Sequence, residues 1–493
     1  MNKTNETITY PDPPQVLTEK PSLKKYLKYI GFFGPGAIVA SLTIGQGQLI
    51  IGPQIGAWAG FALLWLITIN IGSYIIAYVS CRFTMLSGIG VTDLFAIRSK
   101  KGWFNWLLIL IMLFFIPVFA ASIITTLGQC LVWIFGFGHY LWWGISFAIL
   151  IGFIVFLGKY RLLEYTQALF VTVLAVGAII SVLLIQPPPD IAEILPNFFT
   201  IGQNVPQVYP DWVNQVEGFQ KTPIPLTMLG YLGTLTFTLI VLIGYLGWIK
   251  VKKWGIFGSS TDPHLLSHQL LKSLTKNKKI TYLPHDQTEI KKSKILLKPL
   301  LIDLAFAFLV VSIVSTAYMI AGESLLGLQP DGSVLLPSDL DLITEQGRIF
   351  SHMASWLEPL FKISVFFALF GTAYAGFEAG TRMLFETGKT IIPTIKKIEY
   401  RRFMLYVILY ILVPGIPLSI LMWKGLSVLL MLSLTLMFLG VFGVLIYGVG
   451  AVYLSQKVLP DEYKLGKIGF FLSILGIILL SIPVINLVQW LFF

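Results

Sequence analysis

Residues 34–65, GPGAIVASLTIGQGQLIIGPQIGAWAGFALLW, form an apolar stretch with a polar centre, Gly45-Gln46-Gly47-Gln48. A helix in lipid must pair its backbone polar groups internally, so a break is tolerated only where protein buries it or where it lines a cavity. Broken helices of this kind form the midplane substrate sites of secondary transporters. The stretch therefore predicts a chain that spans the membrane several times, with a site at this break.

The composition agrees with a membrane protein. Hydrophobic residues make up 56% of the 493 residues and charged residues only 12%, with a mean hydropathy of +0.80. Soluble domains usually carry about 25% charged residues. Residues 1–20 are polar and contain proline, without an apolar core, so we expect no cleavable signal peptide and an uncleaved first span.

Hydropathy gives the number of spans, because about 20 apolar residues cross the hydrocarbon core. We predict about eleven, near residues 32–53, 58–81, 104–131, 139–157, 162–186, 225–249, 302–327, 359–387, 403–422, 426–454 and 468–491. We expect a cytoplasmic amino-terminal segment (1–31), a ten-helix core (32–454) with a loop at about 250–299, and an extra carboxy-terminal helix (455–493).

The loop charges predict an orientation. Lysine and arginine gather in the amino-terminal segment and in alternate loops, whereas the intervening loops are neutral or acidic. Positive loops stay in the cytoplasm. With an odd number of spans, the N-terminus is then cytoplasmic and the C-terminus lies outside, in a plasma membrane or a bacterial-type inner membrane.

The net charge of +11 follows mainly from this asymmetry. The lysine-rich loop at 250–298 is a candidate for contact with anionic lipid headgroups, and a solvated loop is the simpler alternative. We expect no nucleic-acid partner, because the lysines are confined to one side of the membrane. The chain contains no P-loop, so ATP hydrolysis is not expected.

The sixth predicted span, LTMLGYLGTLTFTLIVLIGYLGWI, is also interrupted by glycines and threonines, around Gly233, Thr234, Thr236 and Phe237. Two interrupted helices five spans apart are the pattern of two five-span inverted repeats. The alternative is structural: small residues allow close helix packing, and threonine can bond to its own helix. Together with Gly45, Gln46, Gly47 and Gln48, these four residues are our candidate substrate-binding residues.

Few ionisable residues lie within the spans, and charge there is a functional hypothesis by default. Glu378, Arg382 and Glu386 of the eighth span are spaced i, i+4, i+8, so each is expected to pair with the next. They are candidates for gating or coupling, and a salt-bridge ladder at the cytoplasmic interface is the alternative. Asp303 lies near a span end and is expected to be interfacial. The histidines fall in loops or at span ends, so none is expected to relay protons at the midplane.

The first two spans resemble those of the Nramp family of divalent-metal transporters, from Gly34-Pro35-Gly36 to the sequence Leu-Leu-Trp at residues 63–65. Weaker similarity runs from Leu-Glu-Pro-Leu at residues 357–360 to Glu386, and the resemblance extends over about residues 25–455. It implies an all-α integral membrane protein of the LeuT-type fold, with ten core helices in two inverted repeats, the first and sixth broken, and one extra helix.

The metal-ligand motifs of that family are not retained. Its first-helix Asp-Pro-Gly-Asn motif corresponds to Gly45, Gln46, Gly47 and Gln48 here, and its sixth-helix Met-Pro-His motif has no counterpart after Met228. Soft thioether ligands select transition metals. A site of amide, hydroxyl and carbonyl oxygens has no fixed negative charge, so we expect poor binding of desolvated divalent ions. We assign no metal ligand with certainty, and Gln48 is the one candidate.

Three functions fit these observations. The first is a secondary transporter of an inorganic or metal cation, and the second is a transporter of a neutral or zwitterionic solute, since glutamine and threonine offer neutral hydrogen bonds. The third is a membrane sensor or scaffold that does not transport. We expect no enzymatic activity and no cofactor; the expected partners are the lipid bilayer and a small ion or solute.

Overall fold

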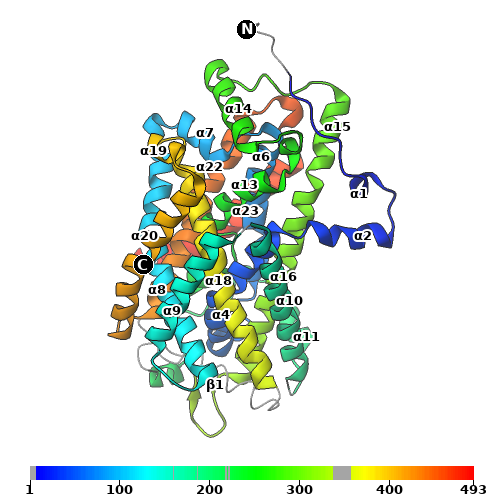
Figure 1. Ribbon diagram of the computed structural model, residues 1–493. Coiled ribbons are helices and arrows are strands. Elements are labelled where there is room, and N and C mark those ends of the chain that lie inside the picture. Colours follow the sequence, from blue (N-terminus) through cyan, green and yellow to red (C-terminus); the bar gives the residue numbers. More distant parts are fainter. Residues whose placement is uncertain are drawn as a thin grey trace.

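The computed structural model describes residues 7–158, 160–185, 187–216, 219, 222–336 and 357–492. The chain forms a bundle of long helices (Figure 1). The first described residues, α7, α14, α15 and α19 lie at one end of the bundle, called here the N-terminal end, and the short hairpin that contains β1 lies at the other end. Of the five histidines expected in loops or at span ends, His352 lies outside the described residues.

The long apolar segments fold into helices close to the predicted spans. Their bounds are α3 (Pro35–Ile44) with α4 (Gln46–Ala59), α5 (Trp65–Ile69) with α6 (Ile71–Ser87), α8 (Trp103–Phe135), α9 (Tyr140–Leu157), α10 (Tyr160–Leu184), α12 (Ile224–Leu235) with α13 (Leu239–Lys252), α16 (Lys298–Leu325), α18 (Leu357–Gly388), α20 (Tyr400–Trp423), α21 (Val428–Leu436) with the π-helix η7 (Met437–Phe442) and α22 (Gly443–Val458), and α23 (Lys467–Phe492).

Among the described residues, ten helices are long and apolar enough to cross a membrane, or eleven if the bent pair Leu23–Phe32 and Pro35–Ile44 counts as one span. The prediction of about eleven spans is confirmed. The first predicted span, 32–53, extends further, to Ala59, where Gly60 at φ +57° ends the helix. Glycine adopts this backbone conformation without the steric cost that other residues meet.

Short elements connect the spans. They are α1 (Gln15–Thr18), α2 (Leu23–Tyr29), η1 (Ile30–Phe32), α7 (Val91–Arg98), η2 (Lys100–Gly102), α11 (Ile191–Ile194), η3 (Leu195–Phe198), η4 (Asp211–Gln215), η6 (Gly255–Ser259), α14 (Pro263–Asn277), α15 (Gln287–Leu296), α19 (Pro393–Lys397), η8 (Asp461–Tyr463) and the antiparallel strands β1 (Gly327–Leu328) and β2 (Val334–Leu335).

Glycines set the closest helix contacts. A Cβ atom built on Gly56 of α4 would lie 2.1 Å from the Met319 carbonyl oxygen of α16. A Cβ atom on Gly440 of η7 would lie 2.4 Å from the Cα of Gly233 in α12. Small residues allow this backbone-to-backbone approach between membrane helices. The contacts hold α4 against α16 and α12 against η7, and so bring both interrupted spans into the interior.

Candidate functional site

The first interrupted span breaks at a single residue. α3 ends at Ile44, Gly45 has φ −63° and ψ −139°, and α4 begins at Gln46. The predicted break is confirmed, but it is shorter than the four residues 45–48, because Gln46, Gly47 and Gln48 are already helical. A Cβ atom on Gly45 would lie 1.5 Å from the Thr372 Oγ1 of α18. A side chain at this position would therefore displace the neighbouring helix.

The sixth span breaks at Thr236–Thr238, between α12 and α13, which confirms the second predicted interruption. The Thr236 hydroxyl lies 3.1 Å from the Gly233 carbonyl oxygen and 2.8 Å from that of Gly440. The Phe237 N–H donates to Ser73 Oγ at 3.0 Å. These contacts satisfy part of the backbone that the break exposes, as a buried break in a membrane helix requires.

The two interrupted spans meet through a side-chain hydrogen bond. Gln48 Nε2 of α4 donates to Thr234 Oγ1 of α12 at 2.7 Å, and the Thr234 hydroxyl donates to the Tyr231 carbonyl oxygen, also at 2.7 Å. Gln48 and Thr234 are buried. The chain of bonds fixes the direction of the Gln48 amide and ties the two predicted halves of the site together.

Replacing Gln48 with alanine should lower the free energy of unfolding by about 1–3 kcal/mol, because it leaves the buried Thr234 hydroxyl oxygen without its donor. Thermal and denaturant unfolding of the purified protein measure this loss. Thr234→Ser keeps the acceptor and is the matched control. A double-mutant cycle with Thr234→Val should show coupling between the two positions; strictly additive losses would mean that the bond does not link the two spans.

A small cavity of about 20 Å³ lies where the two breaks meet. Its lining consists of Leu42, Thr43, Gln46, Gly47, Phe119, Gly233, Thr234, Thr238, Ile240, Thr372, Leu436 and Leu439. Such a volume has room for about one water-sized particle. All of its lining residues except Phe119 are buried, and it lies between two broken spans, where secondary transporters have their substrate sites.

Half of the predicted substrate-binding residues line this cavity. Gln46, Gly47, Gly233 and Thr234 do, whereas Gly45, Gln48, Thr236 and Phe237 lie beside it and hold the breaks in place. Whether any of the eight binds a substrate stays a prediction.

Three hydroxyl-bearing lining residues were not predicted. Thr43 and Thr238 lie two residues or fewer from the predicted segments, so a wider window around each break would have included them. Thr372 is on α18, and nothing near it in the sequence marks it. Its approach to Gly45 becomes visible only in three dimensions.

The Gln46 amide is the most versatile polar group in the cavity lining. The Ser122 hydroxyl has one hydrogen and two possible acceptors. Its oxygen lies 2.8 Å from the Phe119 carbonyl oxygen and 3.2 Å from the Gln46 amide oxygen, so it donates to Phe119. The amide nitrogen has no partner among the described residues. Because amide oxygen and nitrogen can exchange places by rotation, Gln46 can donate to Ser122 and direct its oxygen to the cavity. Gln46 can thus present either a donor or an acceptor.

None of the described residues that line the cavity is charged. The described part of the chain contains no group of three or more His, Cys, Asp or Glu residues placed to hold a metal ion. Gln48, the candidate metal ligand, uses its amide nitrogen on Thr234, and its Oε1 has no partner among the described residues. The oxygens near the breaks are neutral, so they suit a cation of low charge better than a desolvated divalent ion.

The predicted ladder on α18 is only partly formed. Glu378 pairs with Arg382 at 2.5 Å and also accepts a hydrogen bond from Trp248 Nε1 of α13 at 2.8 Å. The Arg382 guanidinium lies 4.7 Å from the ring centroid of Tyr400. This pair links α18 to α13 and α20 in the half of α18 that leads to the N-terminal end of the bundle.

The third member of the ladder was placed wrongly. Glu386 does not pair with Arg382; it pairs with Lys250 at 2.7 Å and with Lys389 at 2.5 Å. The reason is that α13 ends beside α18 and brings Lys250 into the buried space next to Glu386. Sequence spacing along one helix could not show this partner from another helix.

Asp303 is fully buried within the protein, and its expected place at the membrane interface stays a prediction. Its carboxyl group accepts hydrogen bonds from the backbone N–H groups of Gly34 at 2.9 Å and Gly36 at 2.7 Å. It also accepts one from the Tyr245 hydroxyl of α13. A carboxyl group at a helix start satisfies N–H groups that have no partner inside the helix. Asp303 of α16 therefore joins three spans at the start of α3.

Comparisons with known proteins agree with this architecture. The family model "Natural resistance-associated macrophage protein-like" (Nramp) matches residues 36–238. No curated protein matches the chain. Among solved structures, a manganese transporter of Eremococcus coleocola is similar at 14% identity and a TM-score of 0.63, over 95% of this chain and 88% of that one.

Two other transporter structures have a similar fold. Mhp1, a nucleobase-cation-symport-1 family transporter, is 13% identical with a TM-score of 0.52, over 93% of this chain and 92% of that one. MhsT in complex with L-phenylalanine is 16% identical with a TM-score of 0.52, over 92% of this chain and 97% of that one. The predicted LeuT-type fold is confirmed, and the first part of the chain is related to the Nramp family.

Proposed function

We propose that this Nramp-related integral membrane protein is a secondary transporter that moves a small inorganic cation by alternating access. The observation that carries this proposal is the cavity of about 20 Å³ at the junction of the two broken spans, lined by amide and hydroxyl groups. In this conformation the cavity is too small for an organic solute and large enough for an ion. The manganese transporter of Eremococcus coleocola, with the same fold, supports a metal cation as cargo.

The neutral lining makes the cargo a hard cation bound by oxygen atoms. Gln46, Thr43, Thr238 and Thr372 supply amide and hydroxyl oxygens around the cavity. Without a carboxylate, the site repays little of the cost of removing water from a divalent ion. We therefore expect weaker binding of manganese and iron(II) than at a site that contains carboxylates.

A neutral or zwitterionic solute is the second candidate cargo. It is supported by the absence of charge from the cavity lining and by two neighbours of similar fold, whose structures contain bromovinylhydantoin and L-phenylalanine. This cargo requires a wider cavity in another conformation. Under both readings the chain is not an enzyme. We place its N-terminus in the cytoplasm and its C-terminus outside, in a plasma or inner membrane, on the basis of the loop charges.

Uptake into proteoliposomes tests the proposal. We expect uptake of at least one cation among sodium, potassium, magnesium, calcium and manganese, and we expect Gln46→Ala and Thr238→Val to lower the rate about tenfold or more, because each removes a polar group beside the ion. Thr381→Val is the matched control: this buried threonine bonds to the Phe377 carbonyl of its own helix and does not line the cavity.

The outcomes separate the candidate functions. Uptake of an amino acid or a nucleobase, with no cation as cargo, would replace the cation by a solute. Failure of every ion and solute to enter, by a protein that is folded in the vesicle, would favour the sensor or scaffold. An equal loss of uptake in Thr381→Val would show that the variants act through the fold and not through the cavity.

A further inference from the structure

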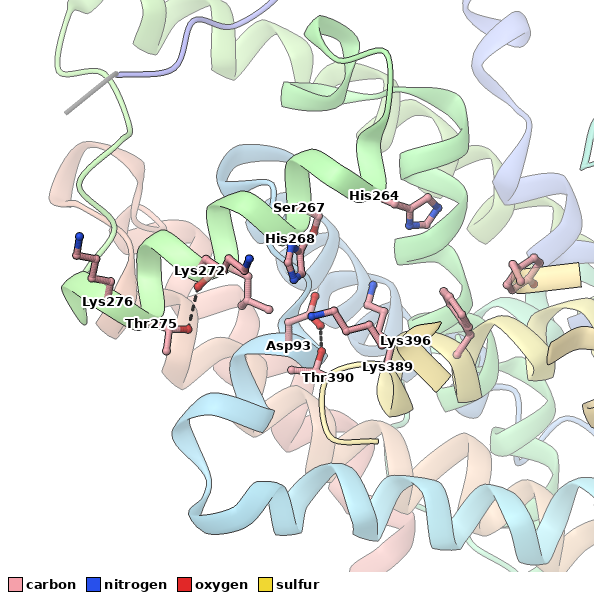
Figure 2. Close-up of a pocket in the computed structure, with 13 residues that line it drawn as sticks. Asp93, His264, Ser267, His268, Lys272, Thr275, Lys276, Lys389, Thr390 and Lys396 are labelled. Carbon is pink, nitrogen blue, oxygen red and sulfur yellow. Dashed lines mark hydrogen bonds between the residues drawn. The ribbon is translucent and has the colours of Figure 1, made fainter. Parts of the chain in front are cut away.

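A second, much larger cavity lies at the N-terminal end of the bundle. It has a volume of about 660 Å³ and lies between α14 on one side and α7, the end of α18, α19 and the start of α20 on the other (Figure 2). It shares no lining residue with the central cavity. Its size falls within the range of about 300–1,000 Å³ that small-molecule sites occupy.

One face of α14 is basic and faces this cavity. His264, His268, Lys272 and Lys276 follow one another at intervals of four residues, so they form a stripe along the helix, and all four line the cavity. Leu270 and Leu274 of the same helix are buried elsewhere in the protein. Lys272 and Lys276 carry like charges at i and i+4, which destabilises a helix; both are exposed, and both line the cavity.

The opposite wall adds positive charge. Lys389 and Lys396 line the cavity, and Asp93 is the single acidic residue among the described residues of its lining. Lys389 is already paired with Glu386, and Asp93 accepts a hydrogen bond from the Thr390 hydroxyl (Figure 2). Within the described residues, no ion pair includes Lys272, Lys276 or Lys396, and no second carboxylate lines the space to balance them.

The lysines of both walls affect the pKa of a histidine in the cavity lining. The pKa of the His268 imidazole is lowered first by desolvation and then by the ammonium groups of Lys396 and Lys272, while Asp93 opposes the change. Lys272 comes from α14 and Lys396 from α19, so positive charge converges on His268 from both walls. The cavity therefore has positive charge on both of its walls.

We propose that this cavity is a binding site for a phosphate-bearing polyanion, held between Lys272 and Lys276 of α14 and Lys396 of α19. Lysine ammonium groups bind phosphate oxygens as point charges. Lysines on two walls fit a ligand with at least two phosphate groups better than a single phosphate. Such a ligand is either a soluble phosphate compound or the headgroup of a phosphorylated lipid. By bridging α14 and α19, the bound anion holds the loop of residues 250–298 against the end of α18.

Thermal unfolding of the purified full-length chain tests the site. Inorganic pyrophosphate is the soluble probe, a short-chain phosphatidylinositol bisphosphate is the headgroup probe, and sulfate at equal ionic strength is the control anion. We expect at least one phosphate probe to raise the unfolding midpoint. The double variant Lys272→Gln/Lys396→Gln should weaken the apparent affinity about tenfold or more. Lys291→Gln/Lys294→Gln, two lysines of α15 outside the cavity, is the matched control and should respond like the unaltered chain.

The two probes identify the source of the anion. A shift with pyrophosphate alone supports a soluble ligand, and a shift with the lipid alone supports a headgroup. The proposal fails if neither probe stabilises the protein at about 1 mM, if sulfate shifts the midpoint equally, or if both double variants lose the response to the same extent. None of these results depends on uptake, so the site and the transport function are tested separately.

Discussion

The substitution Glu386→Gln is expected to lower the free energy of unfolding by about 3–5 kcal/mol. Glu386 is 1% exposed and its partner Lys250 is 0% exposed, at a separation of 2.7 Å, with Lys389 at 2.5 Å on the same carboxylate. Removing the carboxylate leaves the fully buried Lys250 ammonium group without its partner, next to the partly exposed Lys389. An uncompensated buried charge costs more than the intact pair contributes, which is why the effect should be large.

Denaturant unfolding of the purified protein measures this loss. Glu358→Gln is the matched control, because Glu358 pairs with Lys362 on the same helix, but the side chains are 38% and 23% exposed. An exposed pair contributes about 0–1 kcal/mol. Adding Lys250→Met to Glu386→Gln removes one of the stranded charges and should recover part of the stability. A loss no greater than that of Glu358→Gln would show that the cluster is solvated.

Placing a carboxylate at the first break is expected to raise the affinity for manganese about tenfold or more, which corresponds to about 1.4 kcal/mol. Gly45→Asp with Gln48→Asn restores the residue types that the Nramp resemblance places at the ligand positions. The Cβ atom of Asp at position 45 would lie 1.5 Å from Thr372 Oγ1 and 2.6 Å from Thr372 Cβ, so the variant also needs Thr372→Gly. The added charge offsets the dehydration of the ion, which neutral oxygens cannot do.

Isothermal titration with manganese measures the gain, and we expect binding to the unaltered chain to be weaker than about 1 mM. The variant Gly45→Asn/Gln48→Asn/Thr372→Gly has nearly the same shape without the charge and is the matched control. Equal manganese affinity in the two triple variants would mean that the added carboxylate does not contribute to binding. Tight manganese binding by the unaltered chain that disappears in Gln48→Ala would show that neutral oxygens suffice, and would overturn our reading of the cavity.

Much of the fold follows from local physical chemistry. Each run of about 20 apolar residues can satisfy its backbone in lipid only as a helix, so hydropathy located most spans to within a few residues. The first two were placed too early, since 32–53 ends six residues before Ala59 and 58–81 ends six residues before Ser87. The breaks were also predictable, because Gly-Gln-Gly-Gln and Thr-Leu-Thr-Phe-Thr place flexible and polar residues where lipid would forbid them. The sequence could not show that Gln46 to Gln48 remain helical, since that depends on the packing around Gly45.

The site was less predictable, because its contacts join helices that are far apart in the chain. Thr372 reaches Gly45, and Lys250 reaches Glu386, across more than 130 positions in each case. His264, His268, Lys272 and Lys276 are spaced four residues apart in the sequence, but only the structure shows that all four line one cavity. Spacing along one helix shows which residues are neighbours on that helix. The residues on the opposite wall of a site belong to other helices, which the spacing does not identify.

The buried carboxyl group of Asp303 has a consequence for motion. It receives the N–H groups at the start of α3 and the hydroxyl of Tyr245 on α13, and it belongs to α16. When the first half of span one moves away from α16, the Gly34 and Gly36 N–H groups lose their acceptor and the buried Asp303 carboxyl group loses two donors. Opening of the bundle at the start of α3 therefore carries the free-energy cost of a buried carboxyl group whose hydrogen bonds are not made.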